Sequence, residues 1–294
     1  MRLRHFLIEY SCANFFMQCA KFGRHAFADE LTVLVYHNIP ANEILSFERQ
    51  LSFLNEKFNI VAPDIFEHPE RYDNIKKNKI LVTFDDGFVS QYRVAKTVLE
   101  PLNIKALFFV PTGFIDQPDA NQARRYASIN FFGNKVTPSE IKAEMLPMTW
   151  NNISTLVASG HTIGAHTINH CRLTQVENIE RLRAEVIDCG DRLQKILDVS
   201  ITHFAAPYGQ IDSFDERAMK IAAERYKFYH TSIRGRNKLN GKPFFVLRDT
   251  LAPNEPLSYA RFVVNGGLGL LYWRQARPLR EIENKIQSNV NYNS

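Results

Sequence analysis

Two short motifs of this 294-residue chain carry the side chains best suited to chemistry, TFDDG at 83–87 and HTINH at 166–170. In the first, Asp85 and Asp86 follow an apolar run, and two close carboxylates repel each other. A divalent cation relieves this repulsion, because one carboxylate can bind it while the other stays free as a base. The alternative is an Asx-type turn with solvated aspartates.

In the second motif, His166 and His170 are four residues apart, so both can reach one metal ion if the segment turns helically. An aspartate with two histidines suits zinc, cobalt or ferrous iron and keeps positions open for water and substrate. Such a site is catalytic rather than structural. The alternative is a pair of ordinary loop histidines.

A third motif, APYG at 206–209, brackets Tyr208 with a proline and a glycine. A rigid loop of this kind can aim the Tyr208 backbone N–H at a developing oxyanion. Taken alone, the motif is better explained as a strand-to-helix turn.

The elements that must position these motifs alternate between strand and helix patterns. Strands are predicted at 31–36, 80–84, 105–110, 161–166, 203–209, 228–232 and 244–251, with helices near 47–58, 90–99, 150–158, 175–197 and 214–225. Alternation of this kind indicates parallel strands with crossover helices, and about seven strands can close into a barrel. Barrel chemistry lies at the carboxyl ends of strands, which is where all three motifs fall.

Composition places the chain among ordinary globular proteins. Hydrophobic residues make up 45% and charged residues 23%, and the net charge is 36 − 31 = +5. These values exclude a disordered, collagen-like or disulfide-stapled chain, and the absence of a long block of like charge argues against nucleic acid as a partner. None of the four cysteines forms a CxxC pair, so free thiols are expected.

We divide the chain into an amphipathic segment at 1–30, a single barrel domain at 31–265 and a tail at 266–294. Segment 112–147 is polar, shows no lasting periodicity and is interpreted as an insertion over one face of the barrel. No cleavable signal sequence is evident in the amino-terminal segment, and none is expected. Its apolar stripe either packs on the domain or lies on a membrane surface. The expected location is cytoplasmic, with peripheral contact to the inner membrane as an option.

The three motifs, in this order, resemble those of the NodB-homology polysaccharide deacetylases, carbohydrate esterase family 4. VYHNI at 35–39 resembles the first strand of many members, and 148–167 resembles the stretch before their metal motif. The likeness covers roughly 31–251. It implies an α/β fold with a distorted (β/α) barrel, and metal-dependent removal of acetyl groups from N-acetylated sugars, or from O-acetylated xylan in some members.

The resemblance also implies roles for individual residues. Asp85 matches the general base, and Asp86, His166 and His170 match the metal ligands. Tyr208 matches the loop whose N–H stabilises the oxyanion.

Two positions depart from the family pattern. Many members have an arginine at the position of Ala205, where it orients the base, and a histidine on a late strand as the general acid. Here the late strand carries Arg248 instead, as in some members with an exopolysaccharide role. We hypothesise that Arg248 supplies the guanidinium that Ala205 cannot.

The general acid must then come from elsewhere. His37, at the end of the first predicted strand, is our candidate, while His230 is interpreted as a core histidine. His161 and His203 precede their strands and fall at the wrong face of the barrel.

The leading hypothesis is a metal-dependent hydrolase that deacetylates an N-acetylated polysaccharide or oligosaccharide in exopolysaccharide or cell-envelope glycan metabolism. The expected cation is Zn²⁺, with Co²⁺, Ni²⁺ or Fe²⁺ as alternatives, and the expected partner is an acetylated glycan. A non-catalytic carbohydrate-binding protein on the same scaffold is the alternative, and a non-haem iron oxygenase is a third class. The oligomeric state is left open.

Overall fold

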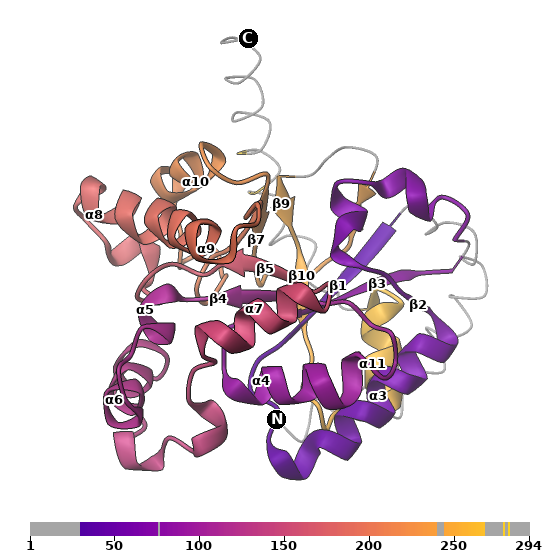
Figure 1. The fold of residues 1–294 in the computed structure, drawn as a ribbon. Helices are drawn as coiled ribbons and strands as arrows, with labels where there is room; N and C mark the ends of the chain where they lie inside the picture. Colours follow the sequence, from indigo (N-terminus) through magenta and orange to yellow (C-terminus); the bar gives the residue numbers. More distant parts are fainter. Residues whose placement is uncertain (1–29, 76, 240–243, 268–278, 280–281, 283–294) are drawn as a thin grey trace.

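The computed structural model describes residues 30–75, 77–239, 244–267, 279 and 282 (Figure 1). The predicted amphipathic segment, except Glu30, and most of the predicted tail lie outside these residues, so the predictions of membrane contact and location stay predictions. Within the described part of the chain, no helix is long and apolar enough to cross a bilayer.

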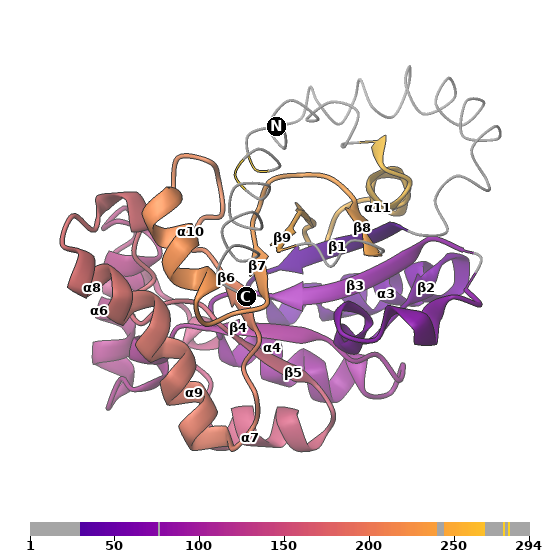
Figure 2. The same ribbon diagram turned by 90° about the horizontal axis from the view of Figure 1, so that it is seen from above.

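A curved, mostly parallel sheet forms the centre of the molecule (Figure 2). Six strands pair in chain order, namely β1 (Glu30–Tyr36), β3 (Lys79–Phe84), β4 (Leu107–Val110), β5 (Thr162–Ala165), β6 (His203–Ala205) and β7 (Phe228–His230). β10 (Arg248–Thr250) pairs with β1 at one edge and β9 (Phe245–Val246) with β7 at the other. The short β2 (Asn59–Ile60) extends β3, and β8 (Asn237–Lys238) pairs antiparallel with β1. The expected α/β barrel is confirmed.

The two edge strands of the sheet, β9 and β10, follow each other in the chain with only Leu247 between them. We call this junction between the two edges the seam of the barrel. The expectation of a single strand over 244–251 is therefore wrong. The side chain of Asn237 explains the break: its Oδ1 accepts from the Leu247 N–H at 2.8 Å and its Nδ2 donates to the Leu247 carbonyl at 2.9 Å. These bonds satisfy the main chain of Leu247 without a neighbouring strand.

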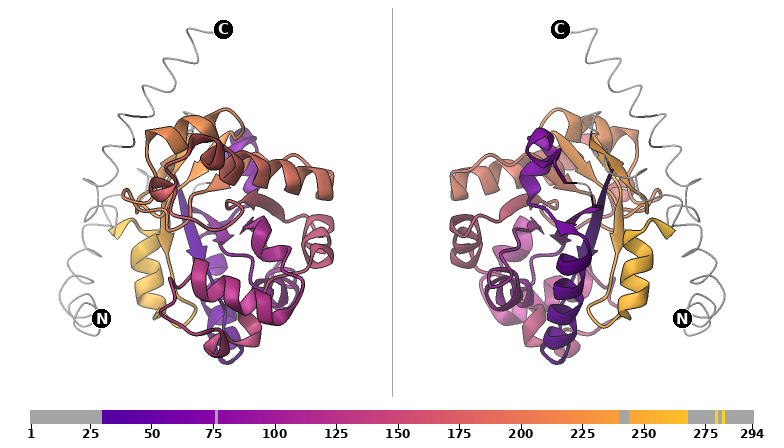
Figure 3. Two further views of the ribbon diagram at one scale, coloured as in Figure 1. Left: turned by 90° about the vertical axis from the view of Figure 1, so that its left-hand side faces the viewer. Right: turned by 90° about the vertical axis from the view of Figure 1, so that its right-hand side faces the viewer.

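Helices cover the outer face of the sheet (Figures 1 and 3). They are α3 (Ile44–Lys57), α4 (Val89–Val94) with a following π-helical turn (Ala95–Leu99), α7 (Trp150–Ala158), α8 (Ile179–Arg183), α9 (Cys189–Leu197), α10 (Glu216–Ala223) and α11 (Leu257–Val264). Alternate strand residues such as Leu34 and Phe84 pack under these helices, whereas Leu31, Val33 and Leu81 fill the barrel interior. The period-two pattern of each strand thus builds two apolar layers.

Segment 112–147 contains two α-helices, α5 (Thr112–Ile115) and α6 (Ala120–Asn130), and two 3-10 turns (Pro138–Glu140 and Ala143–Met145). The expected lack of periodicity is therefore wrong for α6. Asp119 caps α6, its carboxylate accepting from the backbone N–H groups of residues 121 and 122. The buried stripe of α6 consists largely of Ala123, Tyr126 and Ala127, two of them too small to give a strong periodic signal. With Phe88 and Phe114, this stripe belongs to a hydrophobic cluster separate from the main core.

Candidate active site

Sharp turns at the carboxyl ends of β3, β5 and β6 bring the three motifs together. Asp86, Thr167, His170 and Tyr208 adopt left-handed backbone conformations with φ of 79°, 61°, 51° and 64°. Such conformations cost energy for residues other than glycine and are concentrated at functional sites. The turn after β3 begins at Asp86 and continues through Gly87 (φ 72°), which separates the directions of the two adjacent aspartates.

Asp86, His166 and His170 form a group of potential metal ligands, with one donor atom of each lying within 4.8 Å of the others. Oδ1 of Asp86 is 3.5 Å from Nε2 of His166 and 3.2 Å from Nε2 of His170. All three side chains are buried. The sequence-predicted ligand set is thus brought together in space.

The hydrogen bonds of the two histidines fit a metal site. Nδ1 of His166 lies 2.8 Å from the carbonyl of Ala205, and Nδ1 of His170 lies 3.1 Å from the carbonyl of Asn130. A carbonyl only accepts, so each Nδ1 carries the proton, and a neutral ring then presents an Nε2 lone pair toward Asp86. Two nitrogen lone pairs and a carboxylate facing one point form a donor set for a divalent cation.

Charge is balanced locally at Asp86. Burial alone would raise the pKa of this carboxyl. Without a metal ion, the Nε2 atoms of His166 and His170 can also carry protons and donate to Asp86, and these bonds outweigh burial and hold the pKa of Asp86 far below its usual range. Asp86 is therefore ionised, as a ligand must be.

Asp85 forms a buried, two-pronged ion pair with Arg248. Nη1 and Nη2 of Arg248 lie 2.7 and 2.8 Å from Oδ1 and Oδ2 of Asp85. The Arg248 Nε donates to the carbonyl of Thr231 at 2.8 Å, and its guanidinium carbon lies 5.1 Å from the centroid of the Phe109 ring. Burial alone would raise the pKa of Asp85. The opposing effect, which comes mainly from the positive charge of Arg248, is larger, so the pKa of Asp85 lies below its ordinary value. The carboxylate is thereby fixed in position and ionised.

The surroundings of Ala205 show why its side chain leaves room for this arrangement. Ala205 packs with Leu107 and Phe109 in a small interior cluster, and Arg248 lies over the same Phe109 ring. The guanidinium thus enters from β10, at the seam of the barrel, rather than from β6.

Tyr208 and His170 share one hydrogen-bond acceptor, the main-chain carbonyl of Asn130 at the end of α6. The Tyr208 hydroxyl donates to this carbonyl at 2.8 Å, and Nδ1 of His170 faces the same oxygen. The guanidinium of Arg172 lies 4.6 Å from the centroid of the Tyr208 ring, which is 38% exposed. Sequence reasoning missed Asn130 because it acts through its main chain.

Four further histidines lie at the strand ends where the sequence places them. His37 directly follows β1 and is exposed. The side-chain amide of Gln91 donates to the main-chain carbonyls of both His37 and Asp85, so His37 lies on the same side of the barrel as Asp85. His230 is fully buried, with Nε2 3.0 Å from Nδ1 of His203. His161 and His203 lie at the opposite ends of their strands.

Fold and site together define a class of proteins: α/β barrels that gather an arginine-paired carboxylate and three potential metal ligands at the carboxyl ends of their strands. The sequence model of the polysaccharide deacetylase family matches residues 72–225, more than half of the chain, and the chain belongs to this family. It is a carbohydrate deacetylase, a hydrolase acting on carbon–nitrogen bonds other than peptide bonds. A search of curated protein sequences finds no match.

Solved structures support the fold. The chain is similar to the deacetylase PplD of Streptococcus pyogenes (TM-score 0.60, 20% identity, 98% of that chain covered) and to IcaB from Ammonifex degensii (0.60, 24%, 97%). It is also similar to a de-N-acetylase from Aggregatibacter actinomycetemcomitans (0.61, 19%, 100%). Each likeness covers 80% of this chain.

Proposed function

We propose that the protein is a metal-dependent N-deacetylase of an N-acetylated polysaccharide or oligosaccharide. The observation that carries this proposal is the placement of the Asp85–Arg248 pair beside the group formed by Asp86, His166 and His170. One carboxylate is held ionised by a fixed guanidinium, and the other faces two imidazole nitrogens. The two aspartates therefore have different partners and suit different tasks.

The ligand set favours zinc, with Co²⁺, Ni²⁺ or Fe²⁺ as substitutes, because one carboxylate and two neutral imidazoles leave positions open for water and substrate. Asp86, His166 and His170 would hold the ion. When bound, such an ion polarises a carbonyl and lowers the pKa of water.

Asp85 acts as the general base in this proposal. Its carboxylate takes a proton from the attacking water as the water oxygen bonds to the acetyl carbon. Arg248 keeps the carboxylate ionised and fixes its direction. The Tyr208 backbone N–H donates to the oxyanion that develops on the acetyl oxygen.

The leaving nitrogen needs a proton when its bond to the acetyl carbon breaks, and His37 is proposed to supply it. The products are then acetate and a free amine on the sugar. Two features support His37: it lies on the same side of the barrel as Asp85, and it is exposed, so it can exchange protons with solvent.

A role in exopolysaccharide or cell-envelope glycan metabolism is part of the proposal. One of the similar solved structures is described as a de-N-acetylase. Arg248 on the late strand also matches the sequence resemblance to family members with an exopolysaccharide role. The non-catalytic alternative is disfavoured, because a binding protein has no need of a buried base beside a complete metal-ligand set.

Acetate release from N-acetylglucosamine oligomers, measured with and without a chelator, tests the proposal. Asp85→Asn should lower turnover by about 10²- to 10⁴-fold while the protein still binds zinc, because general-base catalysis contributes that much. The matched control is Asp73→Asn, an exposed aspartate, which should release acetate at the original rate. Unchanged release with the chelator, or with Asp85→Asn, would contradict the proposal.

A further inference from the structure

A buried carboxylate that no step above uses lies against the loop between the two histidine ligands. Glu185 is 2% exposed and belongs to a π-helical turn (Ala184–Asp188) between α8 and α9. We propose that Glu185 is a positioning residue for the metal-ligand loop 166–170, an inference that rests on the metal site proposed above. It touches no reacting atom and acts through the loop.

Three donors from the loop converge on this carboxylate. The backbone N–H groups of Ile168 and Asn169 donate to Oε2 of Glu185 at 3.1 and 2.8 Å. The side-chain amide of Asn169 donates to Oε1 at 2.7 Å. Hydrogen bonds to an ionised acceptor are the stronger kind, and their loss is costly inside a protein.

The loop needs such a restraint because both of its ends are bent into unfavourable conformations. Thr167 and His170 are non-glycine residues in the left-handed region, which persists only where the surroundings impose it. Ile168 and Asn169 lie between them. A carboxylate bound to these two residues therefore fixes the direction from which His170 approaches Asp86.

The opposite side of the loop is held by the start of α5 and by α6. Gly113 N–H and the Tyr126 hydroxyl both donate to the Ile168 carbonyl at 2.9 Å. A Cβ on residue 113 would lie 2.6 Å from that carbonyl oxygen, so the close approach requires glycine. The loop is thus held by Glu185 on one side and by Gly113 and Tyr126 on the other. Among these contacts, only Glu185 supplies a charged group.

A carboxylate suits this position better than an amide. Three N–H donors meet two oxygen atoms, and a glutamine would replace one oxygen with a further donor. The Nε2 of that glutamine would then oppose the main-chain N–H groups, or would face an Asn169 amide that has to turn over in order to accept from it. A π-helical turn interrupts a regular helix and is frequent at functional sites, consistent with Glu185 being held here for this task.

The experiment uses the full-length protein, stripped of metal and titrated with Zn²⁺ and with Co²⁺. Glu185→Gln should weaken zinc binding by about 10- to 100-fold, the usual effect of losing a group that orients a ligand. The visible spectrum of the Co²⁺ form should change, because its coordination geometry depends on the ligand directions. The matched control is Glu180→Gln, an exposed glutamate on α8.

A compensating change keeps the inference testable if Glu185→Gln is less stable. In Glu185→Gln with Asn169→Asp, the new carboxylate accepts from the new amide, and the donor–acceptor pairing is restored in reverse. This double variant should recover most of the zinc affinity and the original Co²⁺ spectrum. A purely structural role of Glu185 instead predicts that folded Glu185→Gln keeps the original spectrum. Unchanged affinity and spectrum in Glu185→Gln overturn the inference alone, whereas no metal binding by the original protein overturns the metal site and the inference together.

Discussion

The two ends of β5 carry one histidine each, and the two residues differ in what their Nδ1 atoms meet. At the carboxyl end, Nδ1 of His166 donates to the Ala205 carbonyl, which leaves Nε2 as a lone pair. At the amino end, Nδ1 of His161 accepts from the Ala106 N–H at 3.1 Å, so the proton of the neutral ring is on Nε2. Only the first ring can bind a metal through Nε2.

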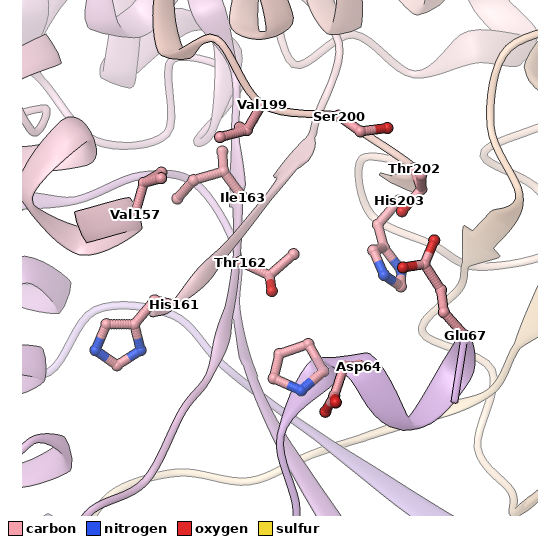
Figure 4. Close-up of a pocket in the computed structure, with 11 residues that line it drawn as sticks. Asp64, Glu67, Val157, His161, Thr162, Ile163, Val199, Ser200, Thr202 and His203 are labelled. Carbon is pink, nitrogen blue, oxygen red and sulfur yellow. The ribbon is translucent and has the colours of Figure 1, made fainter. Parts of the chain in front are cut away.

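The surroundings at the two ends differ in the same sense. The amino ends of β5 and β6 line a cavity of about 220 Å³. Two carboxylates, those of Asp64 and Glu67, also line this cavity (Figure 4). Asp64 there is engaged by Arg71 and Tyr72, and Glu67 by Lys227. Within the described part of the chain, the only group suited to a metal lies at the carboxyl ends. The partners of a histidine, rather than its burial, therefore decide whether it can act as a ligand.

The largest expected effect comes from the same substitution made at both ends of β5. In His166→Asn, the amide can still donate to the Ala205 carbonyl, but the ligand nitrogen is lost, so acetate release should fall to the level of the chelated protein. In His161→Asn, Oδ1 can still accept from the Ala106 N–H, and bound zinc should stay at one ion per chain. Zinc content by elemental analysis checks both variants. Equal zinc loss in both would contradict the claim that His166 is a metal ligand and His161 is not.

The second effect concerns the charges at the carboxyl end. Arg248→Met leaves Asp85 buried without its partner, and breaking a buried pair costs about 3–5 kcal/mol of unfolding free energy. Because Arg248 lowers the pKa of Asp85, the acid limb of the kcat/KM profile should also move to higher pH. Urea unfolding and the pH profile are the measurements. The double variant with Asp85→Asn should recover part of the lost stability, and no recovery would refute a direct interaction.

The smallest effect is expected at the amino end, as a pH dependence of stability. Burial, with a lesser contribution from the charge of Lys105, lowers the pKa of His161 to about 4. The unfolded chain, with an ordinary pKa near 6.5, then binds more protons between these values, so stability is full above about pH 6.5 and falls as the pH drops toward 4. The loss due to His161 is at most about 1.4 kcal/mol per pH unit. His161→Asn should remove this part, while the buried His203 and His230, whose pKa values are also lowered by burial, keep their own contributions. Urea midpoints at pH 7 and pH 5 that fall equally in both proteins would contradict this assignment.

The barrel, and the meeting of the sequence motifs at one site, were predictable because they depend on side-chain type and on strand periodicity. Arg248 could be paired with Asp85 in advance because the family pattern left a charge missing at Ala205. Asn130 could not be found, since a main-chain carbonyl leaves no trace in residue type. Glu185 could not be found either, because one glutamate in a helix rich in Glu and Arg is typical of a solvated face. The break at Leu247 depends on a side chain ten residues away, which no local pattern reveals.

The seam at Leu247 has a consequence for the order in which a ribosome makes the protein. The segment that matches the family model, 72–225, contains Asp85 and all three potential metal ligands, but Arg248 follows 163 residues after Asp85. During synthesis, Asp86, His166 and His170 can therefore leave the ribosome and come together well before Arg248, which pairs with Asp85, has been added to the chain. Contacts between residues so far apart in the chain are slow to form. We therefore expect the nascent protein to reach its full hydrolytic activity only after β10 has paired with β1, so that barrel closure and full activation coincide.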